Sequence, residues 1–191
     1  MKKILVGTHN RGKFKEISFL LSKKIKKISP KSLKIKSPKE TGKTFVENAK
    51  LKARYFSKFC SLPVISDDSG LCIKSLNEKP GIFSARWAKK YGSFKKAMKV
   101  ILKRMKNKKN RSAIFICCLA FISKKKIITT TGKIKGSISY KIKGEKGFGY
   151  DPIFIPSTKS ITFGEMNRRS KMKMDHRYIA FKELKKKIKI L

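Results

Sequence analysis

The ten-residue run Ala113–Ile122, A-I-F-I-C-C-L-A-F-I, constrains the fold more than any other segment of this 191-residue chain. Its apolar residues do not alternate with polar ones, a pattern typical of a strand that is buried on both faces. The run is also far shorter than the ~20 apolar residues that a membrane-spanning helix needs. The sequence therefore predicts a central strand covered on both sides, and no membrane span.

The segments around this run supply the covering layers. Helical spacing of apolar residues is found in Gly12–Ser22, the segment opened by the capping pattern Thr44-x-x-Glu47, Phe94–Met105 and Tyr178–Lys189. Strand-like patterns are found in Lys2–Gly7, Ile25–Ile35, Val64–Ile65, Leu71–Ile73 and Lys126–Ser139, and Asn77–Ser84 reads as a loop. This order predicts an α/β fold, a mixed central sheet flanked by helices, within a single domain spanning residues 1–191.

The charge and the cysteines exclude some classes of protein. The chain has 51 Lys plus Arg against 11 Asp plus Glu, a net charge of +40, but the lysines are spread over nearly every segment. We therefore favour a solvated lysine-rich surface over a nucleic-acid-binding protein, which stays an alternative. The four cysteines form no C-x-x-C pair, and the apolar stretch Ile4–Val6 is too brief for a signal peptide. We expect a cytoplasmic protein with reduced thiols and no membrane partner.

The segment Gly7-Thr8-His9-Asn10-Arg11-Gly12-Lys13 lies between a predicted strand and a predicted helix. Such a loop points backbone N–H groups and the helix dipole at an anion, so it predicts a phosphate-binding loop. Its spacing also matches G-x-x-x-x-G-K, but Phe14 stands where a P-loop needs Ser or Thr for magnesium. A P-loop-like NTPase that releases orthophosphate is therefore the weaker alternative.

Acidic residues are rare in this chain, and two of them are adjacent. Asp67-Asp68 follows the short run Val64-Ile65, and carboxylates at a strand end make a plausible magnesium site. Adjacent side chains of a strand point to opposite faces, so we expect only one of the pair to face the site directly. Glu40 precedes the capped helix and could supply another carboxylate, or it could simply favour the helix N-terminus.

Two further segments have the composition of nucleotide contacts. Gly147-Phe148-Gly149-Tyr150-Asp151-Pro152 places aromatic rings beside glycines, an arrangement that can stack on a base but that also occurs in ordinary β-bulges. Lys171-x-x-x-x-His176-Arg177 opens the last predicted helix and could bind an anion or a carbonyl oxygen, although such a histidine can also be purely structural.

Together these segments resemble the inosine triphosphate pyrophosphatase family. The matching stretches are T-H-N-R-G-K (8–13), E-T-G-K-T-F-V-E-N-A (40–49), S-D-D-S-G-L (66–71), P-G-I-F-S-A-R-W-A (80–88), G-F-G-Y-D-P-I-F (147–154) and K-x-x-x-x-H-R (171–177). The resemblance implies an elongated α/β fold with a cleft between two lobes, and a homodimer. It also implies magnesium-dependent cleavage of non-standard purine nucleoside triphosphates (ITP, dITP and XTP) to the monophosphate and pyrophosphate.

The resemblance also implies roles for individual residues. Asp68 and Glu40 would be the magnesium ligands, with Asp68 also the proton acceptor, and Ser69 would contact the substrate. The remaining implied contacts are Thr8, His9, Asn10, Arg11, Gly12 and Lys13 with the triphosphate, and Phe148, Gly149, Tyr150, Asp151, Lys171, His176 and Arg177 with the base and nucleotide.

The chain departs from the family pattern at a few positions. His9 stands where many relatives have Gly, and Asp175 and Tyr178 flank the His-Arg pair where Ser and Gly are familiar. These departures bear on specificity more than on the reaction. A related pyrophosphatase that prefers pyrimidine or modified nucleotides is a further alternative.

Overall fold

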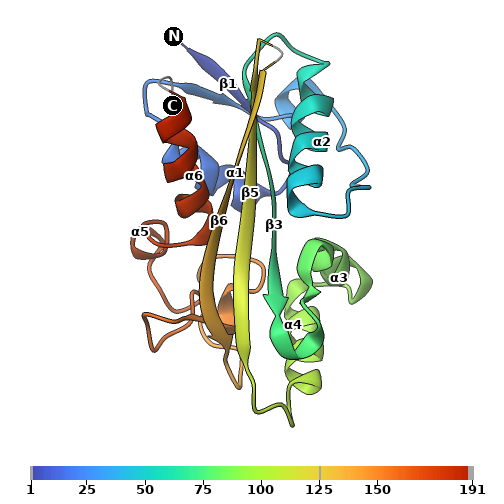
Figure 1. The fold of residues 1–191 in the computed structure, drawn as a ribbon, viewed down its shortest axis with the longest axis vertical. Helices are drawn as coiled ribbons and strands as arrows, with labels where there is room; N and C mark the ends of the chain where they lie inside the picture. Colours follow the sequence, from blue (N-terminus) through green and yellow to red (C-terminus); the bar gives the residue numbers. More distant parts are fainter. Residues whose placement is uncertain (1, 125, 189–191) are drawn as a thin grey trace. The chain divides into compact units, whose positions relative to one another are not determined.

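The computed structural model describes residues 2–124 and 126–188 of the chain (Figure 1). The chain divides into two compact units that are interleaved in sequence. The first unit takes its described residues from Met1–Asp68, Cys117–Gly132 and His176–Leu191, and the second is built from Ser69–Ile116 and Lys133–Asp175. We predicted a single domain over residues 1–191, and the two units of the chain are each described below by itself.

The strands of the described chain form one mixed sheet in the order β2-β1-β3-β5-β6-β7, with β4 paired to β3. The strands are β1 (Lys3–Val6), β2 (Lys26–Ile28), β3 (Val64–Ile73), β4 (Lys79–Pro80), β5 (Ser112–Ser123), β6 (Lys126–Ile138) and β7 (Phe154–Pro156). β1 is parallel to both β2 and β3, whereas β4 and β7 run antiparallel to β3 and β6. The predicted mixed α/β fold is confirmed.

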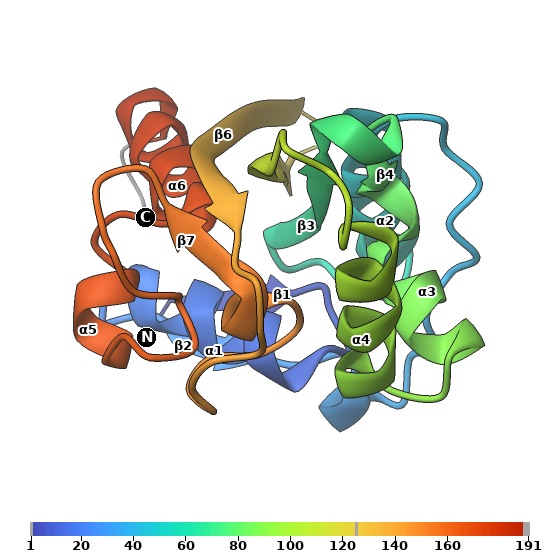
Figure 2. The same cartoon turned by 90° about the horizontal axis from the view of Figure 1, so that it is seen from below.

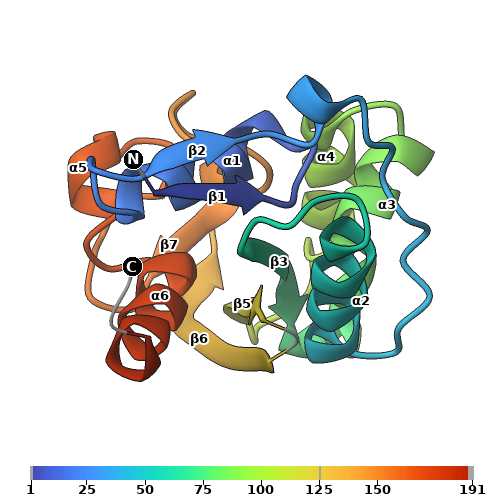
Figure 3. The same cartoon turned by 90° about the horizontal axis from the view of Figure 1, so that it is seen from above.

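The first unit has three layers around this sheet. On one face, α1 (Arg11–Leu20) and α6 (His176–Lys187) pack on Cys117, Leu119 and Phe121 of β5. On the other face, α2 (Phe45–Ser57) packs through Ala49 and Ala53 on Cys118 and Ala120. Figure 3 shows α2 and α6 on opposite sides of the strands. Consecutive β5 residues thus enter two different cores, which explains why the run shows no polar alternation.

The second unit is built around α3 (Ser84–Lys90) and α4 (Phe94–Arg104), which lie next to each other in Figure 2. α4 begins after an N-cap, Ser93, whose side chain accepts from Lys96 N. Its apolar face packs against the end of β3 and the start of β5. The unit also contains the short helix α5 (Arg168–Lys171) and the 3-10 turn η4 (Asp151–Ile153).

Most predicted elements are present, and three differ from expectation. β3 runs without a break through Ser66–Gly70, where we expected two short strands joined at a bend. The predicted loop Asn77–Ser84 contains β4 and leads directly into α3, which the sequence patterns did not indicate. The weak strand Ile25–Ile35 shrinks to β2, because Pro30 opens the 3-10 turn η1 (Lys31–Leu33). The predicted final helix reaches Lys189, which lies outside the described residues.

Candidate active site

The predicted phosphate loop leads from β1 into α1 in the first unit. Asn10 is the N-cap of α1, and its side chain accepts a hydrogen bond from the backbone N–H of Lys13 at 3.1 Å. Thr8 accepts from the backbone N–H of Asn10 at 3.2 Å, and the first turn contains no acidic residue. The loop has little room at its base, since a Cβ on Gly7 would lie 2.2 Å from Ser66 Oγ. This geometry keeps a helix N-terminus available for an anion.

Lys52, on the inner face of α2, joins the two carboxylates that the sequence proposed as metal ligands. Its Nζ lies 2.5 Å from Glu40 Oε1 and 3.2 Å from Asp68 Oδ1. Burial disfavours the charged ammonium, but attraction to Asp68, Asp67 and Glu40 outweighs it and raises the pKa of Lys52. Lys52 therefore stays protonated and holds both carboxylates toward one cationic position.

Asn48 lies one helical turn before Lys52 and fixes the second oxygen of Asp68. Its Nδ2 donates to Asp68 Oδ2 at 3.2 Å, while its Oδ1 accepts from the backbone N–H of Gly42 at 2.8 Å. The side chains of Asn48 and Lys52 are both buried beside the apolar stripe of α2. Asp68 is thus oriented by two residues of one helix, Asn48 and Lys52.

Asp67 points to a different set of partners, as strand alternation requires. Lys13 Nζ and Arg177 Nη2 each lie 3.1 Å from Asp67 Oδ2. Arg177 also pairs with Glu16 of α1, and all three members of this Glu16–Arg177–Asp67 network are buried. Asp67 therefore connects β3 with the start of both α1 and α6.

The two neighbouring aspartates have pKa values that move in opposite directions. Burial would raise the pKa of Asp67, but Lys13, Arg177 and Lys52 together hold it far below its usual range. Burial also raises the pKa of Asp68, and there the opposing pull of Lys52 and Lys13 is not sufficient. Asp67 is thus a permanent anion, whereas Asp68 is the more basic carboxylate, a division typical of proton-transfer sites.

The donor set suits magnesium. Mg²⁺ is commonly held by one or two carboxylates together with substrate phosphates, and Glu40 and Asp68 already converge on one cation, the Lys52 ammonium. Among residues 2–124 and 126–188, no group of three or more His, Cys, Asp or Glu side chains comes together in a way that could hold a metal by itself. The residues present therefore fit a metal that is shared with a phosphate ligand.

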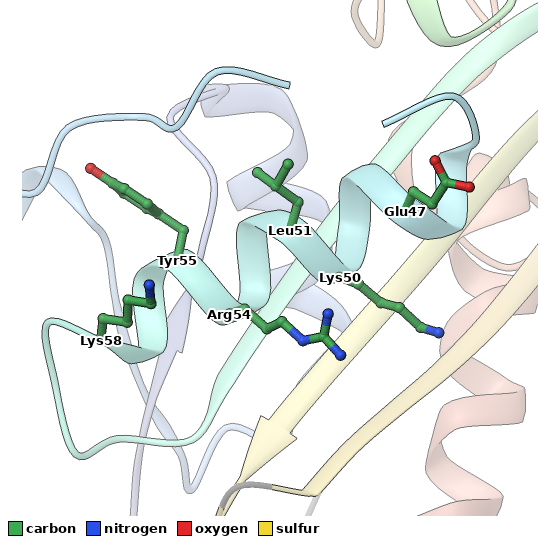
Figure 4. Close-up of a pocket in the computed structure, with 6 residues that line it drawn as sticks. All are labelled: Glu47, Lys50, Leu51, Arg54, Tyr55 and Lys58. Atoms are coloured by element: carbon green, nitrogen blue, oxygen red, sulfur yellow. The ribbon is translucent and has the colours of Figure 1, made fainter. Parts of the chain in front are cut away.

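The outer face of α2 is separate from these carboxylates. A shallow pocket of about 460 Å³ lies along it, and Figure 4 shows its lining side chains, among them Lys50, Arg54, Tyr55 and Lys58. Its only carboxylate, Glu47, accepts from the backbone N–H of Lys43 at 2.7 Å before the helix. Asn48 and Lys52, the residues of α2 that contact Asp68, lie on the inner face instead.

A second cluster of predicted contacts lies within the second unit. Asp151 Oδ2 accepts both the backbone N–H of Phe148, at 2.8 Å, and Lys171 Nζ, at 2.6 Å. Lys171 Nζ also lies 5.1 Å from the centre of the half-buried Phe148 ring. The turn needs Gly147, whose φ is +76° and whose Cβ would meet Asp151. Asp151 therefore organises the loop and holds Lys171 against the aromatic ring.

Several predicted contact residues are internal in the structure. The Tyr150 hydroxyl donates to the Ser84 carbonyl at 3.0 Å and its ring packs edge-on to Phe94, which leaves chiefly its backbone for a ligand. Arg177 is engaged by Glu16 and Asp67, as described above. His176 is buried at the start of α6.

The predicted contact residues Ser69, Arg11 and Gly12 are not buried. Ser69 continues β3 next to Asp68, and Arg11 and Gly12 form the first turn of α1.

Lys52, Asn48 and Glu16 belong to the site but were not predicted. Their one sequence signal is a polar residue beside the apolar positions of a helix, such as Lys52 next to Ala53. In a chain with so many lysines, that signal does not separate Lys52 from its neighbours. Only the fold shows that Lys52 faces Asp68.

Comparison with known proteins places the chain in a family. The model of the Ham1 family matches residues 4–187. The chain belongs to the Ham1 family. A dITP/XTP pyrophosphatase of Dictyoglomus thermophilum is 42% identical over 95% of this chain and 92% of its own length. One from Oceanobacillus iheyensis is 43% identical over 97% and 98%.

Solved structures of Ham1 proteins have the same fold. A HAM1 protein from Coxiella burnetii matches with a TM-score of 0.89 at 34% identity, covering 100% of both chains. The Staphylococcus aureus Ham1 protein matches with a TM-score of 0.87 at 31% identity, covering 98% of both. The Ham1 fold therefore extends over essentially the whole chain.

Proposed function

We propose that this Ham1-family chain hydrolyses non-standard purine nucleoside triphosphates, ITP, dITP and XTP, to the monophosphate and pyrophosphate. The proposal rests mainly on Asp68, a carboxylate with a raised pKa that Lys52 links to Glu40 beside a phosphate loop. The names of the related pyrophosphatases support the same reaction.

The loop and two lysines bind the triphosphate. The N-terminus of α1 offers backbone N–H groups, with Thr8 and Asn10 beside them, and Lys13 and Lys52 supply positive charge. Phosphoryl transfer needs little covalent help, so positioning and charge neutralisation account for most of the rate. The buried Asp67 holds the Lys13 ammonium beside the loop.

Asp68 accepts the proton of the attacking water. Its raised pKa makes it a stronger base than an ordinary aspartate, while the neighbouring Lys52 ammonium favours its ionised form at neutral pH. As the proton moves to a carboxylate oxygen, the water attacks the α-phosphorus and pyrophosphate leaves. Asn48 and Lys52 keep the Asp68 carboxylate in one orientation throughout.

Magnesium would be held by Glu40 and Asp68. When bound with the phosphates, the metal polarises them and makes a bound water more acidic. This cofactor assignment rests on the carboxylate chemistry and on the resemblance.

The Phe148 ring and the Lys171 ammonium suit recognition of the base. The ring can stack on a purine, and a positive donor suits the 6-oxo group that hypoxanthine and xanthine share. Adenine presents an amino group there and would leave a polar group unpaired.

We further propose a homodimer and a cytoplasmic location, which follow from the resemblance. No helix of the described chain is long and apolar enough to cross a membrane.

The P-loop alternative has little in the structure to favour it. Phe14 packs against the core of the first unit and offers no hydroxyl to a metal. Release of orthophosphate would nevertheless identify that reaction directly.

Product analysis tests the proposal. With ITP, XTP, GTP and ATP as substrates, with and without Mg²⁺, we expect inosine or xanthosine monophosphate plus pyrophosphate, only with metal, and little product from ATP. Asp68→Asn should still bind nucleotide but lose about 10²–10⁴-fold in turnover. Glu183→Gln removes an exposed carboxylate of α6 and serves as the matched control. Wild-type turnover in Asp68→Asn, or orthophosphate as product, would overturn the assignment.

A further inference from the structure

His9 is a loop residue whose imidazole is fully engaged by another segment. Its Nε2 lies 2.9 Å from the Ile35 carbonyl oxygen, and its Nδ1 lies 2.6 Å from Ser37 Oγ. A carbonyl oxygen can only accept, so Nε2 carries the proton and donates. In the neutral imidazole, Nδ1 then accepts a hydrogen bond from the Ser37 hydroxyl. Both nitrogens are used, and neither is left for a phosphate.

The segment that His9 contacts is the one that carries Glu40. We call residues 35–43 the strap, because they connect the turn η1 to the N-cap of α2. Within the described chain, the structure assigns no backbone hydrogen bond to residues 36–40. The far end of the strap is held by α2, through Asn48 at Gly42 and Glu47 at Lys43.

His9 provides the corresponding hold at the near end. Residues 35–37 are fixed by the two hydrogen bonds of His9 and by one further bond, in which Ile35 N donates to Pro30 O at 3.0 Å. The imidazole also lies against Phe56 of α2, with ring centres 6.1 Å apart. The His9 ring therefore packs on α2 while its two nitrogens hold the strap.

We infer that His9 is a positioning residue that sets the distance between the phosphate loop and Glu40. The backbone of His9 belongs to the phosphate loop and its side chain holds the strap. The position of Glu40 is therefore fixed relative to the loop that binds the phosphates. Catalysis is sensitive to such spacing, since a displacement of about 1 Å can cost about 10²-fold in rate. The inference rests on the proposed role of Glu40 and goes beyond it, because it assigns His9 to the strap and not to the substrate.

The test separates the two hydrogen bonds of the imidazole. His9→Ala removes both, Ser37→Ala removes one, and His9→Gln keeps a donor for the Ile35 carbonyl. Ser32→Ala is the control, because Ser32 lies in η1 just before the strap and bonds only within its own turn, to Ser29. For each variant, ITP turnover is measured against Mg²⁺ concentration, and amide hydrogen exchange is measured without metal or nucleotide.

We expect His9→Ala to raise the Mg²⁺ concentration for half-maximal turnover by about 3–10-fold. This is less than the 10–100-fold typical of a residue that touches a metal ligand directly. KM for ITP at saturating Mg²⁺ should change less, His9→Gln should recover part of the loss, and Ser32→Ala should match the wild type. The amide of Ile35, the hydrogen-bonded N–H at the near end of the strap, should exchange faster in His9→Ala, while those of α2 keep their protection.

Other outcomes are equally informative. Unchanged exchange in the strap overturns the inference, as does an effect confined to KM for ITP. Faster exchange throughout the first unit reduces His9 to a residue of general stability and also overturns it. If the wild-type chain shows no magnesium-dependent turnover, the proposed function fails, and the exchange experiment still shows whether His9 holds the strap.

Discussion

Asp67 and Asp68 are neighbours on one strand, and the alternation of β3 gives them separate surroundings. Asp67 faces Lys13 and Arg177, whereas Asp68 faces Lys52 and Asn48. Burial affects both, but only Asp67 has enough positive charge around it to reverse the effect on its pKa. One residue thus holds the site together while the next can exchange a proton.

Removing the Lys52 charge should change the pH dependence of the reaction. The ammonium lowers the pKa of Asp68, so in Lys52→Met that pKa rises further above its ordinary value. Since Asp68 acts as a base, activity falls as the pH drops through its pKa. We therefore expect the acid limb of kcat/KM for ITP to move to higher pH in Lys52→Met.

The control for this measurement is Lys58→Met, which removes an exposed lysine at the C-cap of the same helix, beside its outer face. Its acid limb should coincide with that of the wild type. An unmoved limb in Lys52→Met would show that Asp68 is not the group that titrates.

At the scale of elements, the Glu16–Arg177–Asp67 network ties together three of them: α1, β3 and α6. Arg177 is 1% exposed and Asp67 is fully buried. A buried charge that loses its partner is costly, because neither water nor another charge replaces the lost interaction. The network therefore joins both helices to the strand through one side chain, in addition to their shared hydrophobic core.

Arg177→Met should lower the free energy of unfolding by about 3–5 kcal/mol, since it removes the Arg177 charge from the buried carboxylates of Glu16 and Asp67, of which Asp67 keeps its contact with Lys13. Urea denaturation measures this loss. Exposed Lys186, paired with Glu183 on the same helix, supplies the control, and Lys186→Met should cost at most about 1 kcal/mol. Equal stability of Arg177→Met and wild type would show that the network contributes nothing net.

The elements were largely predictable, because their signals are local. Thr44 accepts from Glu47 N at 3.1 Å, as the capping pattern indicated, and the apolar run forms β5. Helix α3 was missed because Pro80 and Gly81 lie just upstream of its first residue, Ser84, and such residues usually mark a loop. Asp68 and Glu40 were singled out as rare acids, but Lys52 was hidden among many lysines. Which lysine meets a carboxylate depends on tertiary packing, and no local pattern records that.

At the scale of the whole molecule, the net charge of +40 is the dominant property. Like charges on a folded surface repel one another, and salt screens that repulsion beyond a Debye length of ~8 Å at physiological ionic strength. The same charge attracts a nucleoside triphosphate at long range. Salt should therefore act on stability and on substrate capture in opposite directions.

Raising NaCl from low to physiological concentration should increase the urea midpoint of unfolding and decrease kcat/KM for ITP. Potassium chloride at equal ionic strength is the control, because screening predicts the same midpoint in both salts. A midpoint that falls with salt would contradict a stability limited by self-repulsion.

The Glu16–Arg177–Asp67 network also bears on the order in which the chain is made. Arg177 is synthesised 110 residues after Asp67 and 161 after Glu16. At a synthesis rate of about 5–20 residues per second, Asp67 waits on the order of 5–20 s for its arginine. Every segment of the second unit leaves the ribosome before His176 does. The part of the protein that is begun first is therefore the part that is completed last, and until then Asp67 has Lys13 and Lys52, but not Arg177, to offset its charge.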